Sequence, residues 1–247
     1  MKMYKKYSPT INAVLLSLFL LLAMSDCATV EEPVFGGTVI DVQGNVYHTV
    51  TLGKQTWMIE NLKTTVLNNG TAIPLLTDSS AWASVGQPGY CWYNNSDSLA
   101  AAQTYGALYN WYVVHSGLLA PKGWHIPSVK EWTQLEETIA AYYNKSGSLA
   151  KILASKTGWE RSTVGASIGN DFSKNNTSGM DAKASGYRAD STAVFEGKGI
   201  KAFWWASNQK DSVKAYRISV SYNLSAVETG FAKFGNGFSV RCIKDSI

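Results

Sequence analysis

The sequence predicts a domain of mixed helix and strand, with strands toward both ends of the domain and two helices between them. Three observations carry this prediction. Residues 39–59 hold β-rich runs separated by turn residues, residues 129–143 place apolar side chains at helical spacing, and residues 203–243 return to strand-like patterns. The chain has 247 residues, of which 45% are hydrophobic, and this is enough for one large core or at most two small ones.

The N-terminal residues predict export. Three lysines precede the apolar run from Ala13 to Met24, which is shorter than the roughly 20 residues of a membrane-spanning helix and is typical of a signal-peptide core. Cys27 stands where a bacterial lipoprotein signal is cleaved and lipidated, so we expect a signal peptide over residues 1–27 and a lipid on Cys27. Asp26 departs from the usual pattern, and the alternative is an ordinary signal peptide with Cys27 incidental.

Residues 28–37 form the expected tether, and residues 38–245 form the expected domain. The tether begins "ATVEEP", and acidic residues soon after the cysteine resemble surface-export signals of Bacteroidetes-type lipoproteins. We therefore expect a lipoprotein of the outer membrane or cell surface, held to the membrane by its lipid. The net charge of +4 includes the lysines of the N-terminal segment, and a near-neutral domain gives no electrostatic reason to expect nucleic acid as a partner.

Tight turns separate the first strands of the domain. Val39–Val42 and Val46–Leu52 flank the turn Gln43-Gly44-Asn45, and this pattern predicts a hairpin. Gly53-Lys54 forms a second turn before the strand expected at Thr56–Ile59.

Two aromatic segments follow. "GYCWYNNSDS", residues 89–98, predicts a capped turn, and the alternative is a calcium site built from Asn94, Asn95 and Asp97. One carboxylate among amides makes a poor calcium site unless ligands come from elsewhere in the chain. "YGALYNWYVVHSG", residues 105–117, has little polar surface and predicts a buried helix.

The segment "GWHIPSVKEW" predicts the start of a helix rather than a catalytic site. Ser128 and Glu131 form a capping box, in which the serine caps the helix and the glutamate reaches back to the serine N–H. Apolar residues then recur at helical spacing over residues 129–143. His125 has no cysteine, aspartate or second histidine at metal-ligand spacing, so we expect no metal and no other cofactor here.

The C-terminal half combines long loops with strands. Residues 144–200 are rich in Gly, Ser, Asn and Lys, and such composition predicts long loops, where binding surfaces often form. "FWWASN" (203–208), "AYRISVSYN" (215–223) and "GFSVRCI" (237–243) predict strands, and the alternation within residues 215–223 is typical of a half-buried antiparallel strand.

The adjacent Trp204 and Trp205 suggest where a ligand would bind. Successive side chains of a strand point to opposite faces, so one tryptophan should fill the core. The other would present an aromatic face beside Asn208, an arrangement that suits sugars, and Tyr222 and Asn223 would extend that surface if the two strands pair. The alternative is that both tryptophans are buried.

Cys91 and Cys242 remain if Cys27 carries lipid. In an oxidising compartment the two cysteines would close most of the domain with a disulfide, which contributes about 4–5 kcal/mol in the chain-entropy model. The alternative is two buried free thiols.

The motifs together resemble a known family. "GNVYHTVTLGKQTWMIENLKTT", "GYCWYNN", "YGALYNWY", "APKGWHIPSVKEWTQL", "FWWASN" and "GFSVRCIKD" occur in the order typical of the Fibrobacter succinogenes major paralogous domain. Members of this family are typically exported and often lipoproteins. Two of the segments also resemble the C-type-lectin-like fold shared with formylglycine-generating enzymes. The resemblance implies an α+β domain with two helices, short antiparallel strands and long loops.

The same resemblance guides the functional expectation. The cysteine pair of formylglycine-generating enzymes and the sugar-binding motifs of calcium-dependent lectins have no match in this sequence, and Ala120-Pro121 stands where family members often have Cys-Pro. We expect a non-catalytic cell-envelope lipoprotein whose C-type-lectin-like domain binds a glycan or a protein partner. The alternatives are an enzyme of the formylglycine-generating type with a rewired site, and a fimbrial or matrix subunit.

Overall fold

The computed structural model describes residues 32–84, 86–96, 98–143 and 148–246. The predicted signal peptide, the expected lipidation site Cys27 and the first residues of the tether lie outside these ranges. Among the described residues, no helix is both long enough and apolar enough to cross a membrane.

One sheet joins the two ends of the domain. Its strand order is β1-β2-β3-β12-β6, and every neighbouring pair is antiparallel. The strands are β1 (Val34–Ile40), β2 (Val46–Leu52), β3 (Gln55–Met58), β12 (Ile243–Lys244) and β6 (Trp124–His125). The predicted hairpin and its second turn are confirmed, although β1 begins earlier than expected.

A second sheet has the order β11-β10-β9-β7-β8. Its strands are β7 (Ser185–Arg188), β8 (Phe195–Lys198), β9 (Lys201–Gln209), β10 (Lys214–Ser221) and β11 (Glu228–Lys233). The pairing is antiparallel except between β7 and β9, and β10 is antiparallel to both of its neighbours, as its alternation predicts. A small third sheet pairs β4 (Tyr90–Cys91) with β5 (Leu108–Tyr109).

The strand expected over residues 237–243 is mostly absent. Phe238 and Ser239 form isolated bridges to Tyr109 and Trp204, and only Ile243 belongs to a named strand, β12. The segment crosses between sheets instead of lying along one of them, so its alternating pattern marks burial rather than a continuous ladder.

The expectation of two helices is wrong. The described residues form five α-helices, and only α4 is longer than seven residues. They are α1 (Ser79–Ala83), α2 (Leu99–Tyr105), α3 (Trp111–His115), α4 (Val129–Tyr143) and α5 (Leu149–Leu153). The chain is therefore an α+β domain in which most helices are single turns.

The buried helix expected over residues 105–117 forms only at Trp111–His115, as α3, and Leu108–Tyr109 form strand β5 instead. Tyr105 ends α2, because Gly106 adopts a φ of +72° and leaves the helical path. Asn110 then starts α3, since its side-chain oxygen accepts a hydrogen bond from Val113 N at 3.3 Å.

The capping box at the start of α4 is confirmed. Ser128 N donates to Glu131 Oε2 at 2.7 Å, and Glu131 N donates to Ser128 Oγ at 3.3 Å. The helix covers residues 129–143, the range that its apolar spacing predicts. Asn208 of β9 also caps it, because its Oδ1 accepts a hydrogen bond from Val129 N at 2.7 Å.

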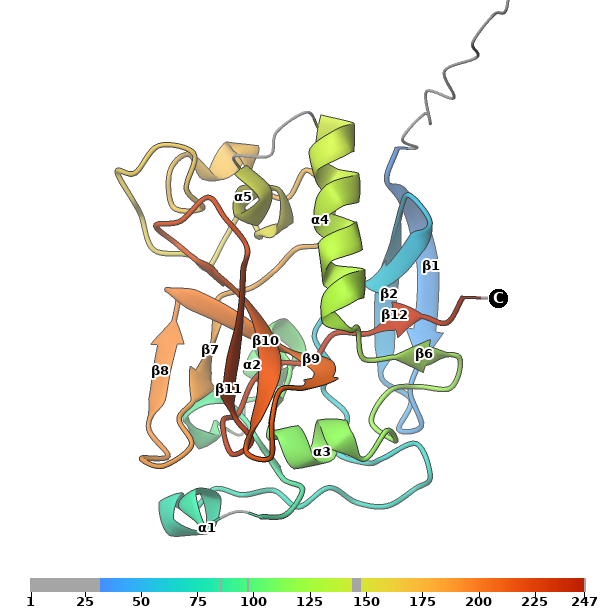
Figure 1. Cartoon of the computed structure of the whole chain (residues 1–247), viewed down its shortest axis with the longest axis vertical. Coiled ribbons are helices and arrows are strands. Elements are labelled where there is room, and N and C mark those ends of the chain that lie inside the picture. Colours follow the sequence, from blue (N-terminus) through green and yellow to red (C-terminus); the bar gives the residue numbers. More distant parts are fainter. Residues whose placement is uncertain (1–31, 85, 97, 144–147, 247) are drawn as a thin grey trace, which may run out of the picture.

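Helix α4 stands alongside both large sheets (Figure 1). Its Trp132 packs against Trp57 of β3, with ring centroids 4.7 Å apart, and against Trp204 of β9 at 5.8 Å. The opposite face of β9 is covered by α3, whose Trp111 lies 5.6 Å from Trp205. Strand β9 is therefore buried between two apolar clusters, one on each face.

Two buried arginines tie loops to this core. Arg188 donates to the carbonyl oxygens of Leu76, Thr77 and Ala193, at 2.5, 3.1 and 3.1 Å. Its guanidinium also lies 4.6 Å from the ring centroid of Trp82. Arg188 thus holds the irregular segment before β4 by its backbone.

The second buried arginine, Arg241, lies next to Trp204 of β9. It donates to Met180 O at 2.5 Å and to Asn61 Oδ1 at 3.2 Å, and its guanidinium lies 5.6 Å from the ring centroid of Trp204. Burial lowers the pKa of Arg241 to about 10, and the nearby Asp181 partly offsets this effect.

Candidate functional site

The surface predicted around the paired tryptophans is not formed. Trp204 and Trp205 do point to opposite faces, but they are only 2% and 0% exposed, because both faces of β9 are covered. The indole N–H of Trp204 donates to Asn61 Oδ1 at 2.8 Å, and that of Trp205 donates to Tyr109 O at 2.8 Å. The alternative expectation, that both are buried, describes the structure.

The other three residues of that predicted surface have separate environments. Asn208 is exposed but caps α4, and Asn223 Oδ1 accepts a hydrogen bond from Ser221 Oγ at 2.9 Å. Tyr222 is half-buried and packs against the apolar cluster that contains Trp204. Strands β9 and β10 do pair, yet the pairing brings no ligand surface together.

The disulfide expected between Cys91 and Cys242 is also not formed. Both are buried free thiols, and they belong to different apolar clusters. Burial raises the pKa of the Cys91 thiol to about 12 and raises that of Cys242 further. Neither thiol is therefore activated as a thiolate at neutral pH.

His125 is clamped between two carboxylates. Its Nε2 lies 2.7 Å from Glu131 Oε1, and its Nδ1 lies 2.6 Å from Asp245 Oδ1. Burial lowers the pKa of His125, but the hydrogen bonds to the two carboxylates outweigh that effect and the pKa is raised. With both ring nitrogens occupied, the histidine links the start of α4 to the end of the chain. No group of three or more potential metal ligands occurs among the described residues.

Aromatic side chains gather around a hollow of about 200 Å³ between η1 (Tyr93–Asn95), α2 and the end of β8. We call it the aromatic pocket. Its lining residues are Trp92, Tyr93, Asn94, Ser96, Ala101, Ala102, Tyr105, Gly106 and Lys198. All three aromatic rings are half-buried, so each is held by the protein while part of it stays accessible.

The turn predicted at residues 89–98 forms one wall of the aromatic pocket. Asn94 and Asn95 adopt φ values of +56° and +51°, and Asn95 Nδ2 donates to Thr77 O at 2.8 Å. These left-handed residues turn the chain so that Tyr93 packs on Gly186 of β7, where a Cβ atom would overlap the tyrosine ring. Asp97, part of the calcium alternative, lies outside the described residues.

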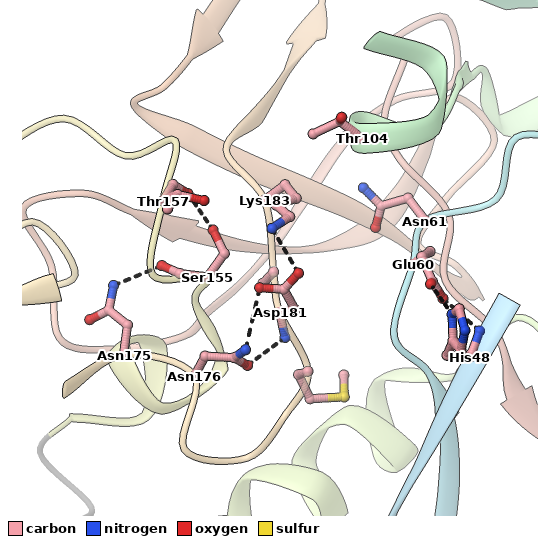
Figure 2. Close-up of polar contacts among 12 residues, drawn as sticks. His48, Glu60, Asn61, Thr104, Ser155, Thr157, Asn175, Asn176, Asp181 and Lys183 are labelled. Carbon is pink, nitrogen blue, oxygen red and sulfur yellow. Dashed lines mark hydrogen bonds and ion pairs between the residues drawn. The ribbon is translucent and has the colours of Figure 1, made fainter. Parts of the chain in front are cut away.

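Tyr105, the last residue of α2, and Gly106, which follows it, line the pocket. A Cβ atom on Gly106 would lie 2.7 Å from Leu62 O, so only glycine allows this close approach. The Asn61 side chain secures the same point, because its Nδ2 donates to Tyr105 O at 2.9 Å. In Figure 2 Asn61 lies below the turn of α2 that carries Thr104.

Trp204 supports the pocket indirectly. Its indole N–H donates a hydrogen bond to Asn61 Oδ1, and Asn61 Nδ2 in turn donates to the carbonyl oxygen of Tyr105. The tryptophan that was expected to touch a ligand therefore does not line the aromatic pocket. It is connected to the pocket residue Tyr105 through two hydrogen bonds, both made by Asn61.

Lys198 closes the rim of the aromatic pocket. Its Nζ lies 4.5 Å from the ring centroid of Tyr105 and 5.6 Å from that of Tyr93. The sequence did not single out Lys198, because it is far from the tyrosines along the chain and only the β7–β8 hairpin brings it near them. The clustering of Trp92, Tyr93 and Asn94 was the one local signal for this pocket.

A larger hollow of about 580 Å³ lies beside α5, but its charged groups are already engaged. Lys151 Nζ donates to the carbonyl oxygens of Ser167, at 3.0 Å, and Asn170. Lys174 pairs with Asp171 at 3.1 Å. These contacts hold the surrounding loop and leave little polar capacity for a ligand.

The loop between α5 and β7 is held by similar contacts. Asn175 Nδ2 donates to Ser155 O at 2.9 Å, and Asp181 N donates to Asn176 Oδ1 at 2.7 Å (Figure 2). Lys183 pairs with the Asp181 carboxylate at 2.7 Å. The sequence predicts long loops over residues 144–200, but α5, β7 and β8 form within this range. The long loop is therefore shorter than expected: it runs from α5 to β7, and polar side chains fix its course.

The fold and the pocket define an α+β domain with a small, partly aromatic surface site. The sequence profile of the Fibrobacter succinogenes major domain matches residues 50–244, and the chain belongs to that family. Searches of curated proteins and of solved structures found no match.

Proposed function

We propose that this chain is a non-catalytic glycan-binding domain of an exported lipoprotein. The observation that carries the proposal is the aromatic pocket, in which Trp92, Tyr93 and Tyr105 expose parts of their rings beside the amide of Asn94. Sugar rings offer apolar C–H faces that pack on aromatic rings, and hydroxyl groups that bond to amides. A volume of about 200 Å³ is below the range of about 300–1,000 Å³ for drug-sized ligands, and it suits one sugar unit of a longer chain.

The pocket is also built to hold its shape before a ligand arrives. Tyr93 is packed on Gly186 and lies 5.3 Å from Phe195, and the backbone of Tyr105 is fixed by Asn61. A preformed site loses less conformational entropy on binding. This smaller cost matters most for a ligand such as a single sugar unit, which makes few contacts of its own.

A glycan array probed with the full chain in detergent tests this proposal. We expect binding to at least one glycan class, with Tyr105→Ala weakening it at least tenfold. Tyr142→Ala serves as the matched control, because Tyr142 is half-buried and lies outside the aromatic pocket. Absence of all glycan binding, or equal losses in the two variants, would refute the proposal.

The cellular setting is part of the same proposal. The apolar run before Cys27 and the family resemblance support export to the outer membrane or cell surface, with a lipid on Cys27. Several acyl chains at about 0.8 kcal/mol per buried methylene would make release from the membrane negligible. Cys27→Ala should give a soluble or unprocessed protein, and a variant that is cleaved and fractionates with membranes as before would contradict the lipid anchor.

A C-type-lectin-like arrangement is proposed for the fold. The supporting features are the sheet that joins both ends of the domain through β3 and β12, and the long loop between α5 and β7. The alternative of formylglycine-generating chemistry is disfavoured, because Cys91 and Cys242 lie in separate clusters and have raised pKa values.

Self-assembly is a second candidate function, favoured by the edge strand β1. Val34, Phe35 and Ile40 on this strand are 59%, 57% and 61% exposed, and among the described residues β1 pairs only with β2. An exposed apolar edge is a template for pairing with another chain. Gel filtration distinguishes the two candidates, because a matrix or fimbrial subunit would elute as polymers.

A further inference from the structure

We infer that the aromatic pocket selects a sugar that carries a carboxylate, such as a uronate, through the ammonium group of Lys198. This inference rests on the proposed glycan-binding function and adds the chemical class of the ligand. It is carried by the position of one cation inside a pocket whose other lining side chains are neutral.

The Glu160 carboxylate lies near Gly199, the residue after Lys198, but no ion pair joins it to Lys198. The described lining residues of the pocket contain no aspartate or glutamate, and Lys198 takes part in none of the ion pairs between described residues. By contrast, Lys174, Lys183 and Lys233 lie 3.1, 2.7 and 3.4 Å from aspartate oxygens. An anionic ligand would therefore meet an available cation at this site.

The backbone fixes where Lys198 begins. It lies between Gly197 and Gly199, whose φ values are +78° and +80°, in a turn closed by the hydrogen bond from Ile200 N to Gly197 O at 2.9 Å. Gly199 N also donates to Ala184 O at 3.0 Å, which ties the turn to the sheet. The lysine therefore starts from a defined point beside the pocket.

The two tyrosine rings then define where its ammonium group lies. The distances of 4.5 and 5.6 Å to the ring centroids of Tyr105 and Tyr93 are within the range of cation–π contacts. These contacts use the ring faces and leave the three N–H donors of the ammonium group able to bond to oxygen. A carboxylate on a sugar held by the rings would accept charge-assisted hydrogen bonds from them.

A neutral sugar could still pack on the rings, but it would gain nothing from the charge. The two classes of ligand therefore differ in their dependence on Lys198, while both depend on the tyrosines. This difference makes the inference separable from the proposed function.

The test uses the full chain in detergent and a panel of oligosaccharides ending in glucuronate, galacturonate or sialate. Each is paired with its methyl ester, which keeps the ring and removes the charge. We expect at least one acid to bind about tenfold more tightly than its ester, and this preference to weaken as salt rises from 50 to 500 mM, because added ions screen exposed charges.

Lys198→Met should weaken binding of that acid about tenfold and change binding of the ester less than twofold. Lys130→Met is the matched control, since Lys130 is exposed on α4 and does not line the pocket, and it should change neither. Equal melting temperatures would show that the variants are folded. Equal binding of acid and ester, or unchanged acid binding in Lys198→Met, would overturn the inference and leave glycan binding intact. Failure to bind any glycan, acidic or neutral, would remove both.

Discussion

Asn61 bonds to three polar groups, two of them on the buried side chains of Trp204 and Arg241, and its replacement by alanine should be among the most damaging single changes in this domain. Its Oδ1 accepts hydrogen bonds from Trp204 Nε1 at 2.8 Å and from Arg241 Nη2 at 3.2 Å, and its Nδ2 donates to Tyr105 O at 2.9 Å. Asn61→Ala leaves an indole N–H, a guanidinium N–H and a carbonyl group without these partners.

The expected loss of stability follows from the number and burial of those groups. An unpaired buried polar group destabilises a protein by about 1–3 kcal/mol, and by more if it is charged. Partial relaxation reduces the sum, so we expect Asn61→Ala to lower the free energy of unfolding by about 3–5 kcal/mol. This is a large fraction of the roughly 5–15 kcal/mol that stabilises a typical domain.

Urea unfolding, followed by tryptophan fluorescence, measures this loss. With a slope of about 2 kcal/mol per molar urea, the midpoint should fall by roughly 2 M. Asn68→Ala is the matched control, because Asn68 is exposed and its side chain donates one hydrogen bond, to Ala120 O at 3.1 Å. The control should lose less than about 1 kcal/mol.

A second variant separates the role of the Asn61 side-chain oxygen, which accepts hydrogen bonds, from that of its nitrogen, which donates one. Asn61→Asp keeps an acceptor for Trp204 and gives Arg241 a carboxylate, but it loses the donor to Tyr105 O. We expect an intermediate loss of stability and weaker glycan binding. If Asn61→Ala lost no more stability than Asn68→Ala, the three hydrogen bonds would not carry the energy assigned to them.

Three further predictions concern packing and pH. Trp204→Ala and Trp205→Ala should each lower the free energy of unfolding by about 3–5 kcal/mol in urea titrations, and a nearly silent variant would contradict the burial of both. Burial, reinforced by neighbouring Glu137, raises the pKa of Glu136 to about 7, so ionisation destabilises the fold as pH rises above about 4.3. Thermal melts should show Glu136→Gln more stable than the native chain by about 1 kcal/mol at pH 8 and equal to it at pH 4, and no difference at pH 8 would argue against this. The pKa of His125 is raised, so its ion pairs with Glu131 and Asp245 stabilise the fold fully below about pH 6.5. This stabilisation is lost as the pH rises through the pKa of the histidine in the folded state. His125→Gln should therefore lose up to about 1 kcal/mol at pH 5.5 and less at pH 9, whereas a loss independent of pH would show that charge is not involved.

Local signals predicted the elements that depend on neighbours along the chain. Ser128 and Glu131 are three residues apart, so the capping box and the start of α4 could be derived without knowing the rest of the fold. The hairpin of β1 and β2 follows from its turn in the same way.

Features that depend on what covers an element could not be predicted. Alternation placed Trp204 and Trp205 on opposite faces, but only the tertiary structure shows that α4 and α3 cover both faces. The number of helices was also missed, because short helices such as α3 depend on one capping residue, Asn110, inside a continuous apolar run.

The aromatic pocket shows the same limit. The chain brings Lys198 to Tyr93 and Tyr105 only after β7 and β8 have paired and α2 has ended at Gly106. The density of Trp, Tyr and Asn at residues 92–95 marked one wall, but no sequence pattern links that wall to the lysine.

The placement of β12 has a consequence for the order of events in biosynthesis. Ile243 pairs with Trp57 on one side and His125 on the other, so the strand formed by Ile243 and Lys244 lies inside the sheet rather than at its edge. The sheet cannot close until these residues have left the ribosome. Because such distant pairings form slowly, a nascent chain should stay open for longer than one that folds from local contacts, and under the export proposed above this delay would leave it unfolded for passage through a secretion channel.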